Sequence, residues 1–236
     1  MNHVIVTGAA GALGAAVVHR LSSEATRCRF DRYSLLDVPQ AQPRLDVLAK
    51  EVSGRAFACD LSSEIEVSRM MREVSNGGAP THAVLVAGGW RGGTPIHEGG
   101  AGDYHDMFRM NVNTVYFALR ALLPAMVLAK RGSIVVIGSR AVERPWTSAG
   151  SAAYAASKSA VVTLAQTVAQ EVLPFSVRVN AIMPSTLDTP ANRRAMPDAD
   201  VSRWVTLESC AGVIDFLLSD DAQDVTGATL PVYGRA

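Results

Sequence analysis

The stretch Thr7-Gly8-Ala9-Ala10-Gly11-Ala12-Leu13-Gly14 follows an apolar run at residues 3–7 and leads at once into a helical pattern. Glycines in such a turn let the backbone approach a pyrophosphate, whose charge is favoured at the N-terminus of the next helix. This turn therefore predicts a dinucleotide site, with cofactor contacts at Gly8, Gly11, Leu13 and Gly14. The same glycines are also compatible with a tight turn that binds no ligand. Other parts of the sequence are needed to distinguish these two alternatives.

Short apolar runs without polar alternation recur along the chain, as in strands that are covered on both faces. They occupy residues 3–7, 33–37, 55–59, 82–87, 133–137 and 177–182, and a last strand is expected at 229–232. Helical periodicity lies between them, notably at residues 67–74, 103–129 and 153–172. The alternation predicts an α/β protein with a doubly wound parallel sheet of about seven strands, whose ligands bind at the carboxyl ends of the strands.

The composition does not divide the chain into blocks. With 236 residues, of which 48% are apolar, it can bury one large core, so residues 1–236 are expected to form a single domain. Two stretches interrupt the rhythm of strands and helices: the glycine-rich residues 88–102, and residues 184–205, which contain three prolines. Long loops in compact domains are more often functional than idle, so we expect both to line a substrate site. We call residues 185–205 the substrate loop.

Charge and cysteine content exclude several classes of protein. Lys plus Arg equals Asp plus Glu at 22 each, so nothing favours a nucleic-acid partner. Cys28, Cys59 and Cys210 lie far apart and are expected to be buried thiols in a reducing compartment. His97 and His105 have no partners at metal-ligand spacing, so no metal is expected. With no leader and no apolar stretch near the roughly 20 residues of a membrane span, the sequence favours a soluble, cytoplasmic protein.

Asp37 ends the second expected strand, 23 positions after Gly14, where an acid can hydrogen-bond an adenosine ribose. Its carboxylate would repel a 2′-phosphate, and neither Ala9 nor Ala10 offers a compensating cation. The sequence therefore favours NAD(H) over NADP(H). Arg44 keeps the NADP(H) alternative open, and Asp37 is also compatible with a capping role.

Tyr154 and Lys158 open a helical run, and their spacing of four residues places the phenol and the ammonium on one helix face. A phenol with an ordinary pKa of about 10 handles protons poorly at neutral pH unless positive charge stabilises its phenolate. Upstream, Ser139 follows the fifth expected strand, where its hydroxyl can hydrogen-bond a reacting oxygen. These three residues predict an acid/base site.

Together these features resemble the short-chain dehydrogenase/reductase family over essentially the whole chain, and the resemblance implies a Rossmann fold. It is carried by residues 7–14, Ala87-Gly88, Asn111, Ser139, Tyr154-x-x-x-Lys158 and Asn180-Ala-Ile-Met-Pro184. It implies that Tyr154 is the general acid/base, that Lys158 lowers the pKa of Tyr154 and binds the nicotinamide ribose, that Ser139 polarises the substrate oxygen, and that Asn111 supports a proton relay. It further implies cofactor contacts at Asp60, Leu61, Ala87, Gly88, Pro184 and Thr189.

The chain departs from the family pattern in ways that leave its substrate open. Ser139 stands 15 residues before Tyr154, two more than is common, which indicates a small insertion at residues 143–150. Residues 87–93, 187–193, 196–200 and Trp204 are similar to loops of the dihydropteridine reductase subfamily. That subfamily usually lacks the active-site serine, which Ser139 supplies here. Relatives can share a loop without sharing a substrate.

The sequence thus favours an NAD(H)-dependent oxidoreductase that interconverts a small carbonyl compound and its alcohol. The alternative is a quinonoid dihydropteridine reductase, and a non-catalytic nucleotide sensor is disfavoured because Ser139, Tyr154 and Lys158 are all present. Trp90, Trp146 and Trp204 fall in segments expected to ring the substrate site, where an indole can stack on a flat substrate, although each is also compatible with a loop anchor. Family members commonly assemble through the helices at 103–129 and 153–172, so a homodimer or homotetramer is expected.

Overall fold

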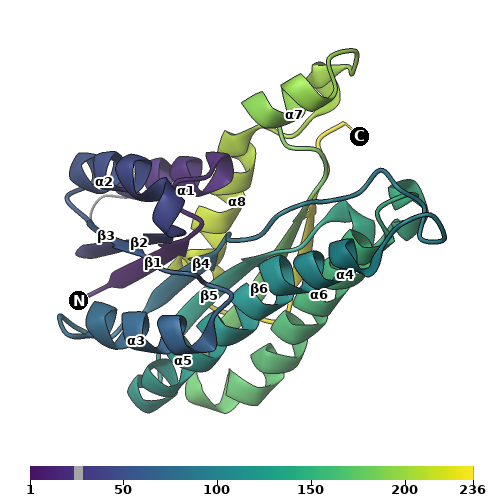
Figure 1. Cartoon of the computed structure of the whole chain (residues 1–236). Helices are drawn as coiled ribbons and strands as arrows, with labels where there is room; N and C mark the ends of the chain where they lie inside the picture. Colours follow the sequence, from purple (N-terminus) through teal and green to yellow (C-terminus); the bar gives the residue numbers. More distant parts are fainter. Residues whose placement is uncertain (24–28, 236) are drawn as a thin grey trace.

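The computed structural model of the protein describes residues 1–23 and 29–235. One parallel sheet of seven strands runs through it in the order β3-β2-β1-β4-β5-β6-β7, with helices on both faces (Figure 1). The strands are β1 (His3–Thr7), β2 (Arg32–Asp37), β3 (Arg55–Ala58), β4 (His82–Leu85), β5 (Gly132–Ile137), β6 (Val177–Pro184) and β7 (Thr229–Val232). The doubly wound parallel sheet expected from the apolar runs is confirmed.

Six of the described α-helices cover the two faces of the sheet. The α-helices are α1 (Ala12–Ser22), α2 (Gln42–Glu51), α3 (Glu64–Ser75), α4 (Ala101–Met107), α5 (Thr114–Ala129), α6 (Ala152–Val172), α7 (Pro190–Ala195) and α8 (Leu207–Leu218). Helices α3, α5 and α6 cover one face, and α1, α2 and α8 cover the other (Figure 1). Because side chains alternate along a strand, each of the strands β1 to β6 contributes side chains to both cores.

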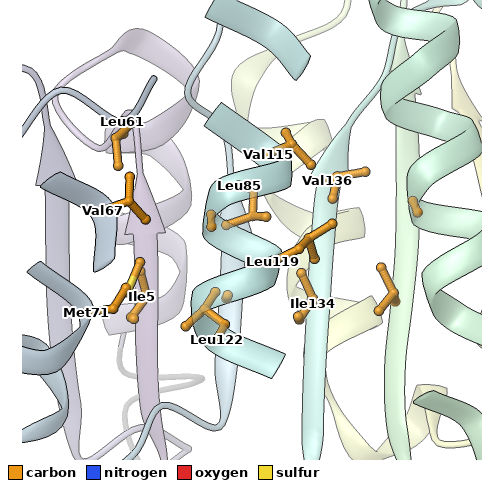
Figure 2. Close-up of a cluster of buried hydrophobic side chains, with 14 of the residues drawn as sticks. Ile5, Leu61, Val67, Met71, Leu85, Val115, Leu119, Leu122, Ile134 and Val136 are labelled. Carbon is orange, nitrogen blue, oxygen red and sulfur yellow. The ribbon is translucent and has the colours of Figure 1, made fainter. Parts of the chain in front are cut away.

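Strand β1 shows how this alternation works. Ile5 belongs to the core under α3, α5 and α6, which Figure 2 shows, whereas Val4 and Val6 belong to the opposite core. All five residues of β1 are buried. An apolar run without polar alternation is therefore the pattern that this position in the sheet requires.

A continuous helical stretch runs from α4 through a π-helical turn at Phe108–Asn113 into α5. An 18-residue window of this stretch has a mean hydropathy of 1.6, so by length and composition alone the helix is apolar enough for a membrane span, contrary to the expectation from the sequence. Core helices of soluble proteins pass the same test. In the fold its apolar side packs on the sheet, where Leu119, Leu122 and Met126 are buried. The apolar composition of α5 is thus explained by the core of the fold.

Two of the three cysteines can be placed. Cys59 and Cys210 are buried free thiols, and burial raises their pKa values to about 11 and about 12. They behave as small apolar side chains, as predicted. Cys28 lies outside the described residues.

The substrate loop contains more regular structure than the sequence indicates. It includes α7 and a 3-10 turn at Val201–Arg203, and Leu187 forms a parallel bridge with Val205 at its base. The backbone N–H of Asp188 donates to the Val205 oxygen at 2.8 Å, and the N–H of Val205 donates to the Thr186 oxygen at 2.9 Å. Backbone hydrogen bonds therefore join the two ends of the substrate loop.

Candidate active site

The glycine turn after β1 leaves an open cradle at the N-terminus of α1. Gly8 has a φ of +64°, and a Cβ on it would lie 2.8 Å from the Ala87 nitrogen. A Cβ on Gly14 would lie 2.1 Å from the Gly8 oxygen, so only glycine lets α1 pack on the turn. Gly11, the N-cap residue of α1, has no side chain to occupy the first N–H groups of the helix. The cradle fits a pyrophosphate, which supports the predicted contacts at this turn.

Among these predicted contacts Leu13 differs, because its side chain is buried in the core under α1. Leu61 behaves likewise and lies in the opposite core (Figure 2). Both residues therefore present backbone rather than side chain toward the carboxyl edge of the sheet. The neighbouring Asp60 carboxylate accepts hydrogen bonds from the Ser62 hydroxyl at 2.6 Å and the Ser62 N–H at 2.9 Å, and the hydroxyl bond is the largest cause that lowers its pKa.

Asp37 stands at the carboxyl end of β2 and contacts the glycine turn directly. Its Oδ2 accepts a hydrogen bond from the Ala10 N–H at 2.9 Å, and its Oδ1 accepts one from the Val38 N–H at 2.8 Å. The carboxylate is thus fixed beside the cradle. It also performs the capping role left open by the sequence.

Ser139 and Tyr154 come from different elements and converge. Ser139 follows the carboxyl end of β5, and its Oγ accepts a hydrogen bond from the Ala141 N–H at 3.2 Å. Tyr154 stands in the first turn of α6. Burial raises the pKa of Tyr154, and a side-chain hydrogen bond with Ser139 acts in the opposite direction. The net rise keeps the phenol protonated at neutral pH.

Lys158 lies one helical turn after Tyr154 and is buried, with 7% of its surface exposed. Its ammonium donates a hydrogen bond to the Ile137 oxygen at 2.8 Å. Loss of hydration lowers its pKa to about 8. The resemblance implies that Lys158 lowers the pKa of Tyr154, but in this structure burial of the phenol dominates.

Asn111 lies in the π-helical turn and ties three segments together. Its Oδ1 accepts from the Gly89 N–H at 2.9 Å, and its Nδ2 donates to the Gly89 oxygen at 3.1 Å and to the Ser157 Oγ at 3.0 Å. A Cβ on Gly88 would lie 2.6 Å from Asn111 Oδ1 and 3.6 Å from Lys158 Nζ. The structure therefore brings Asn111, Gly88 and Lys158 together. π-Helical turns are frequent at functional sites.

Ser157 is a site residue that the sequence analysis missed. It is fully buried, it donates to the Tyr154 oxygen at 2.8 Å, and it accepts from Asn111. Its position directly before Lys158 is the only sequence signal that could have drawn attention to it.

The remaining predicted contacts flank the site at the ends of β4 and β6. Ala87 donates its N–H to the Thr7 Oγ at 3.3 Å, which joins the ends of β1 and β4. Pro184 is the last residue of β6. Thr189 caps α7, and its hydroxyl accepts from the Asn192 N–H at 3.1 Å.

The three tryptophans do not gather around one pocket. Trp90 and Trp146 are 60% and 74% exposed, whereas Trp204 is partly buried and lines a hollow of about 280 Å³ with Arg140. Trp146 belongs to the predicted insertion, which forms a 3-10 turn at Pro145–Ser148. A larger hollow, of about 520 Å³, faces Ala152, Ala156 and Ser159, on a different side of α6 from Tyr154 and Lys158.

Known proteins match both the sequence and the fold. A family model described as short chain dehydrogenase matches residues 2–200. Cyclohexanol dehydrogenase from Rhodococcus sp. (strain TK6) is 30% identical over 98% of this chain and 94% of its own length. The crystal structure of NAD⁺-bound xylitol dehydrogenase has a TM-score of 0.86 at 25% identity, over 99% of this chain and 98% of its own. A 3-oxoacyl-[acyl-carrier protein] reductase from Brucella melitensis with bound NAD has a TM-score of 0.84 at 26% identity, over 99% and 90% of the two chains.

These matches agree with the expectations drawn from the glycine turn and from the residues after β5. They make the protein an oxidoreductase of alcohols or carbonyl compounds that uses a nicotinamide cofactor. The chain belongs to the short chain dehydrogenase family.

Proposed function

We infer that the protein interconverts a small carbonyl compound and its alcohol with NAD(H). The observation that carries this proposal is the convergence of Ser139, Tyr154 and Lys158 at the carboxyl edge of β5, which is also the edge that holds the glycine cradle. A protein that only senses nucleotides has no use for a buried phenol beside a serine hydroxyl. Relatives named for cyclohexanol and xylitol are in keeping with an alcohol or a ketone as substrate.

The phenol of Tyr154 is the proton donor in the reducing direction. Its raised pKa keeps the proton in place until an oxygen with growing negative charge accepts it. The Ser139 hydroxyl lies next to the phenol, so it can donate a hydrogen bond to the same oxygen and orient it. A nicotinamide bound at this edge supplies the hydride in reduction and accepts it in oxidation.

Lys158 and Asn111 hold this arrangement. Lys158 binds the Ile137 oxygen and so connects α6 to the strand that ends at Ser139. Asn111 connects α6, through Ser157, to the backbone after β4. In the oxidising direction Tyr154 has to accept a proton, and the Lys158 ammonium is the positive charge that favours this step once both groups face a bound cofactor.

Asp37 is the basis for proposing NAD(H) rather than NADP(H). Its carboxylate is fixed beside the glycine turn by Ala10, where it can accept a hydrogen bond from a ribose hydroxyl. A 2′-phosphate at the same place would meet this negative charge. Solved relatives with bound NAD support the preference.

A screen with NADH and NAD⁺ tests the proposed function. Ketones, aldehydes and secondary alcohols are offered together with quinonoid dihydropterin, and the nicotinamide absorbance is followed. Turnover of a ketone or alcohol, lost in Tyr154→Phe, is the expected result. Turnover of the dihydropterin alone would overturn it in favour of the pteridine reductase alternative, which rests on the loop sequences.

We also expect the protein to assemble through its long helices. On α5, Tyr116 is 46% exposed and Leu128 is 87% exposed, and exposed apolar side chains of this kind are suited to contact with a second copy. Light scattering coupled to size-exclusion chromatography measures the mass, and a monomer at micromolar concentration would contradict this expectation.

A further inference from the structure

The hollow that contains Trp204 opens one residue beyond Ser139, and the proton-handling residues do not use it. Its lining comes from three segments: Arg140 after β5, Thr186 after β6, and Ala199, Asp200, Arg203 and Trp204 at the far end of the substrate loop. We call it the distal hollow. Its volume of about 280 Å³ is close to the lower end of ligand pockets, which measure roughly 300–1,000 Å³.

The backbone fixes the distal hollow relative to the reacting groups. The Ser139 hydroxyl caps the 3-10 turn Arg140–Val142, so the backbone conformation at Arg140, directly after Ser139, is fixed. Adjacent Cα atoms are about 3.8 Å apart, so the backbone of Arg140, which lines the hollow, lies close to Ser139. Thr186 lies two residues after Pro184, at the same edge of the sheet.

The charge in the distal hollow is positive and available. In the described part of the chain, neither Arg140 nor Arg203 lies within 4.0 Å of a carboxylate oxygen. Asp200 also lines the hollow, but its Oδ1 accepts from the Ser202 hydroxyl at 2.6 Å and the Ser202 N–H at 3.0 Å, which turns the carboxylate toward its own loop. The lining thus carries two guanidinium groups and one carboxylate, which also interacts electrostatically with Arg203, so a net positive charge remains.

The hydrogen bonds of Glu143 and Arg203 go to groups outside the hollow. Glu143, the acid nearest to Arg140 along the chain, accepts a hydrogen bond from the Tyr233 hydroxyl at 2.6 Å. Arg203 donates from Nε to the Arg235 oxygen at 3.3 Å, which fixes its side chain against the C-terminal segment and leaves its other N–H groups unbonded in the described structure. Guanidinium groups in this state bind carboxylates through paired hydrogen bonds.

Trp204 lines the hollow together with the two arginines and adds a flat, apolar surface. An indole presents a large face that packs well against a planar ring. The occupant that matches this lining is therefore a planar ring that carries an anionic group, with the reacting carbonyl at the opposite end toward Ser139.

We propose that the distal hollow binds the carboxylate end of an aryl carbonyl substrate, with Arg140 and Arg203 on the carboxylate and Trp204 on the ring. This inference rests on the proposed function for the direction in which the substrate lies. It adds a substrate class, aromatic ketones or aldehydes with a remote anionic group, to a site whose proton chemistry is common to the family.

Binding of three matched ketones tests the subsite separately from turnover. These are 4-acetylbenzoate, 4-acetylbenzamide and 4-(aminomethyl)acetophenone, which share the ring and the ketone but carry a negative, a neutral and a positive group. Calorimetric titration into the full chain with saturating NAD⁺ measures affinity without reaction, since a ketone and an oxidised cofactor cannot exchange hydride. The carboxylate should bind at least about tenfold more tightly than the amide, because a charge-assisted hydrogen bond replaces a neutral one. The ammonium should bind most weakly.

The two arginines are tested by separate variants. Arg140→Gln and Arg203→Gln should each reduce the ratio of carboxylate to amide affinity about fivefold or more, since each removes one charged donor. Arg194→Gln is the matched control, because Arg194 is an exposed arginine of the same substrate loop that does not line the hollow. Arg203 is exposed, so its variant keeps the test decisive even where Arg140→Gln disturbs folding.

Several outcomes would overturn the subsite. Equal affinity for the carboxylate and the amide in the unsubstituted protein would do so, and so would an unchanged ratio in Arg203→Gln. A loss of NAD⁺ affinity in both variants, with equal losses for all three ketones, would assign the arginines to the cofactor instead. Absence of nicotinamide turnover with every ketone and aldehyde would count against the proposed function, while the affinity ratio would still report on the hollow.

Discussion

The Lys158 ammonium donates a 2.8 Å hydrogen bond to the Ile137 carbonyl oxygen, two residues before Ser139. A neutral backbone oxygen satisfies one of the three N–H groups but offers no opposite charge. Lys158 is therefore a buried cation that has no carboxylate within 4.0 Å in the described part of the chain, and burial lowers its pKa from 10.5 to about 8. Keeping this ammonium at the site should reduce the stability of the fold.

Replacing Lys158 should change the pH dependence of stability in a defined direction. Between about pH 8 and pH 10.5 the unfolded chain holds the Lys158 proton and the folded chain does not, so this residue makes stability rise with pH there. Below pH 8 the full penalty applies. Lys158→Met should therefore gain stability relative to the unsubstituted protein at pH 7, and this difference should shrink by roughly 3 kcal/mol toward pH 10.5.

Urea unfolding of both proteins at intervals from pH 7 to pH 10.5 measures this difference. The comparison removes titrations that the two proteins share, such as those of Cys59 and Cys210. A difference in unfolding free energy that stays constant across this range would show that Lys158 is not destabilised by burial.

Asp37 should set the preference between the two cofactors. The unsubstituted protein is expected to bind NADH more tightly than NADPH. Asp37→Ala should reduce the ratio of NADH affinity to NADPH affinity by roughly ten- to 150-fold, which corresponds to about one to three kcal/mol. Because Asp37 also accepts a hydrogen bond from Ala10, the alanine variant should loosen the glycine turn and weaken both cofactors.

Asp37→Asn separates these two effects. The amide oxygen can still accept from the Ala10 N–H, but the charge that repels a 2′-phosphate is gone. Fluorescence titration of both cofactors should show a reduced ratio of NADH to NADPH affinity in Asp37→Asn. The affinity for both cofactors should fall less than in Asp37→Ala. Tighter binding of NADPH than of NADH by the unsubstituted protein would contradict the role proposed for Asp37.

The substrate loop should close over bound ligands as a lid. Its base is held by hydrogen bonds between Asp188, Val205 and Thr186, whereas residues 190–203 are mostly exposed. Hydrogen exchange should therefore show protection at 190–203 that increases with cofactor and substrate, and little change at the base or in β5. The same protection at 190–203 with and without saturating ligands would rule out a lid.

The sheet could be predicted because its strands carry their own signal. A strand buried on both faces needs apolar residues throughout, so residues 133–137 and 177–182 stand out before any packing is known, and β5 and β6 contain both runs. Tyr154, Lys158 and Ser139 could be proposed because the end of a parallel strand and the first turn of the next helix meet at one edge.

Other features depend on contacts that a local pattern does not contain. Asn111 lies in a π-helical turn within a helix whose apolar periodicity looks continuous. Ser157 belongs to the site because Asn111, in this turn, donates a hydrogen bond to its hydroxyl. The distal hollow exists because Arg203 and Trp204 return to Arg140 from more than sixty residues along the chain. Trp90 and Trp146 are of a residue type that often contacts flat substrates, yet both side chains are exposed in the structure.

Ser139 should distinguish carbonyl reduction from pteridine reduction. In carbonyl reduction negative charge grows on the oxygen, and a hydroxyl aimed at it contributes several kcal/mol, so Ser139→Ala should reduce kcat by about 10²-fold or more with cofactor affinity nearly unchanged. A quinonoid pterin can spread the incoming electrons over its ring system, so the same substitution should cost little there.

The Ser139 hydroxyl also caps the turn that begins at Arg140, so a loss of activity has to be separated from a disturbed turn. Ser139→Thr keeps a hydroxyl for both tasks and should retain much more activity than Ser139→Ala. Tyr154→Phe removes the proton donor and should abolish most of the carbonyl reaction without disturbing this turn. Steady-state kinetics on the best substrate decides the matter: near-complete activity of Ser139→Ala would exclude the ketone and alcohol assignment and leave the pteridine one.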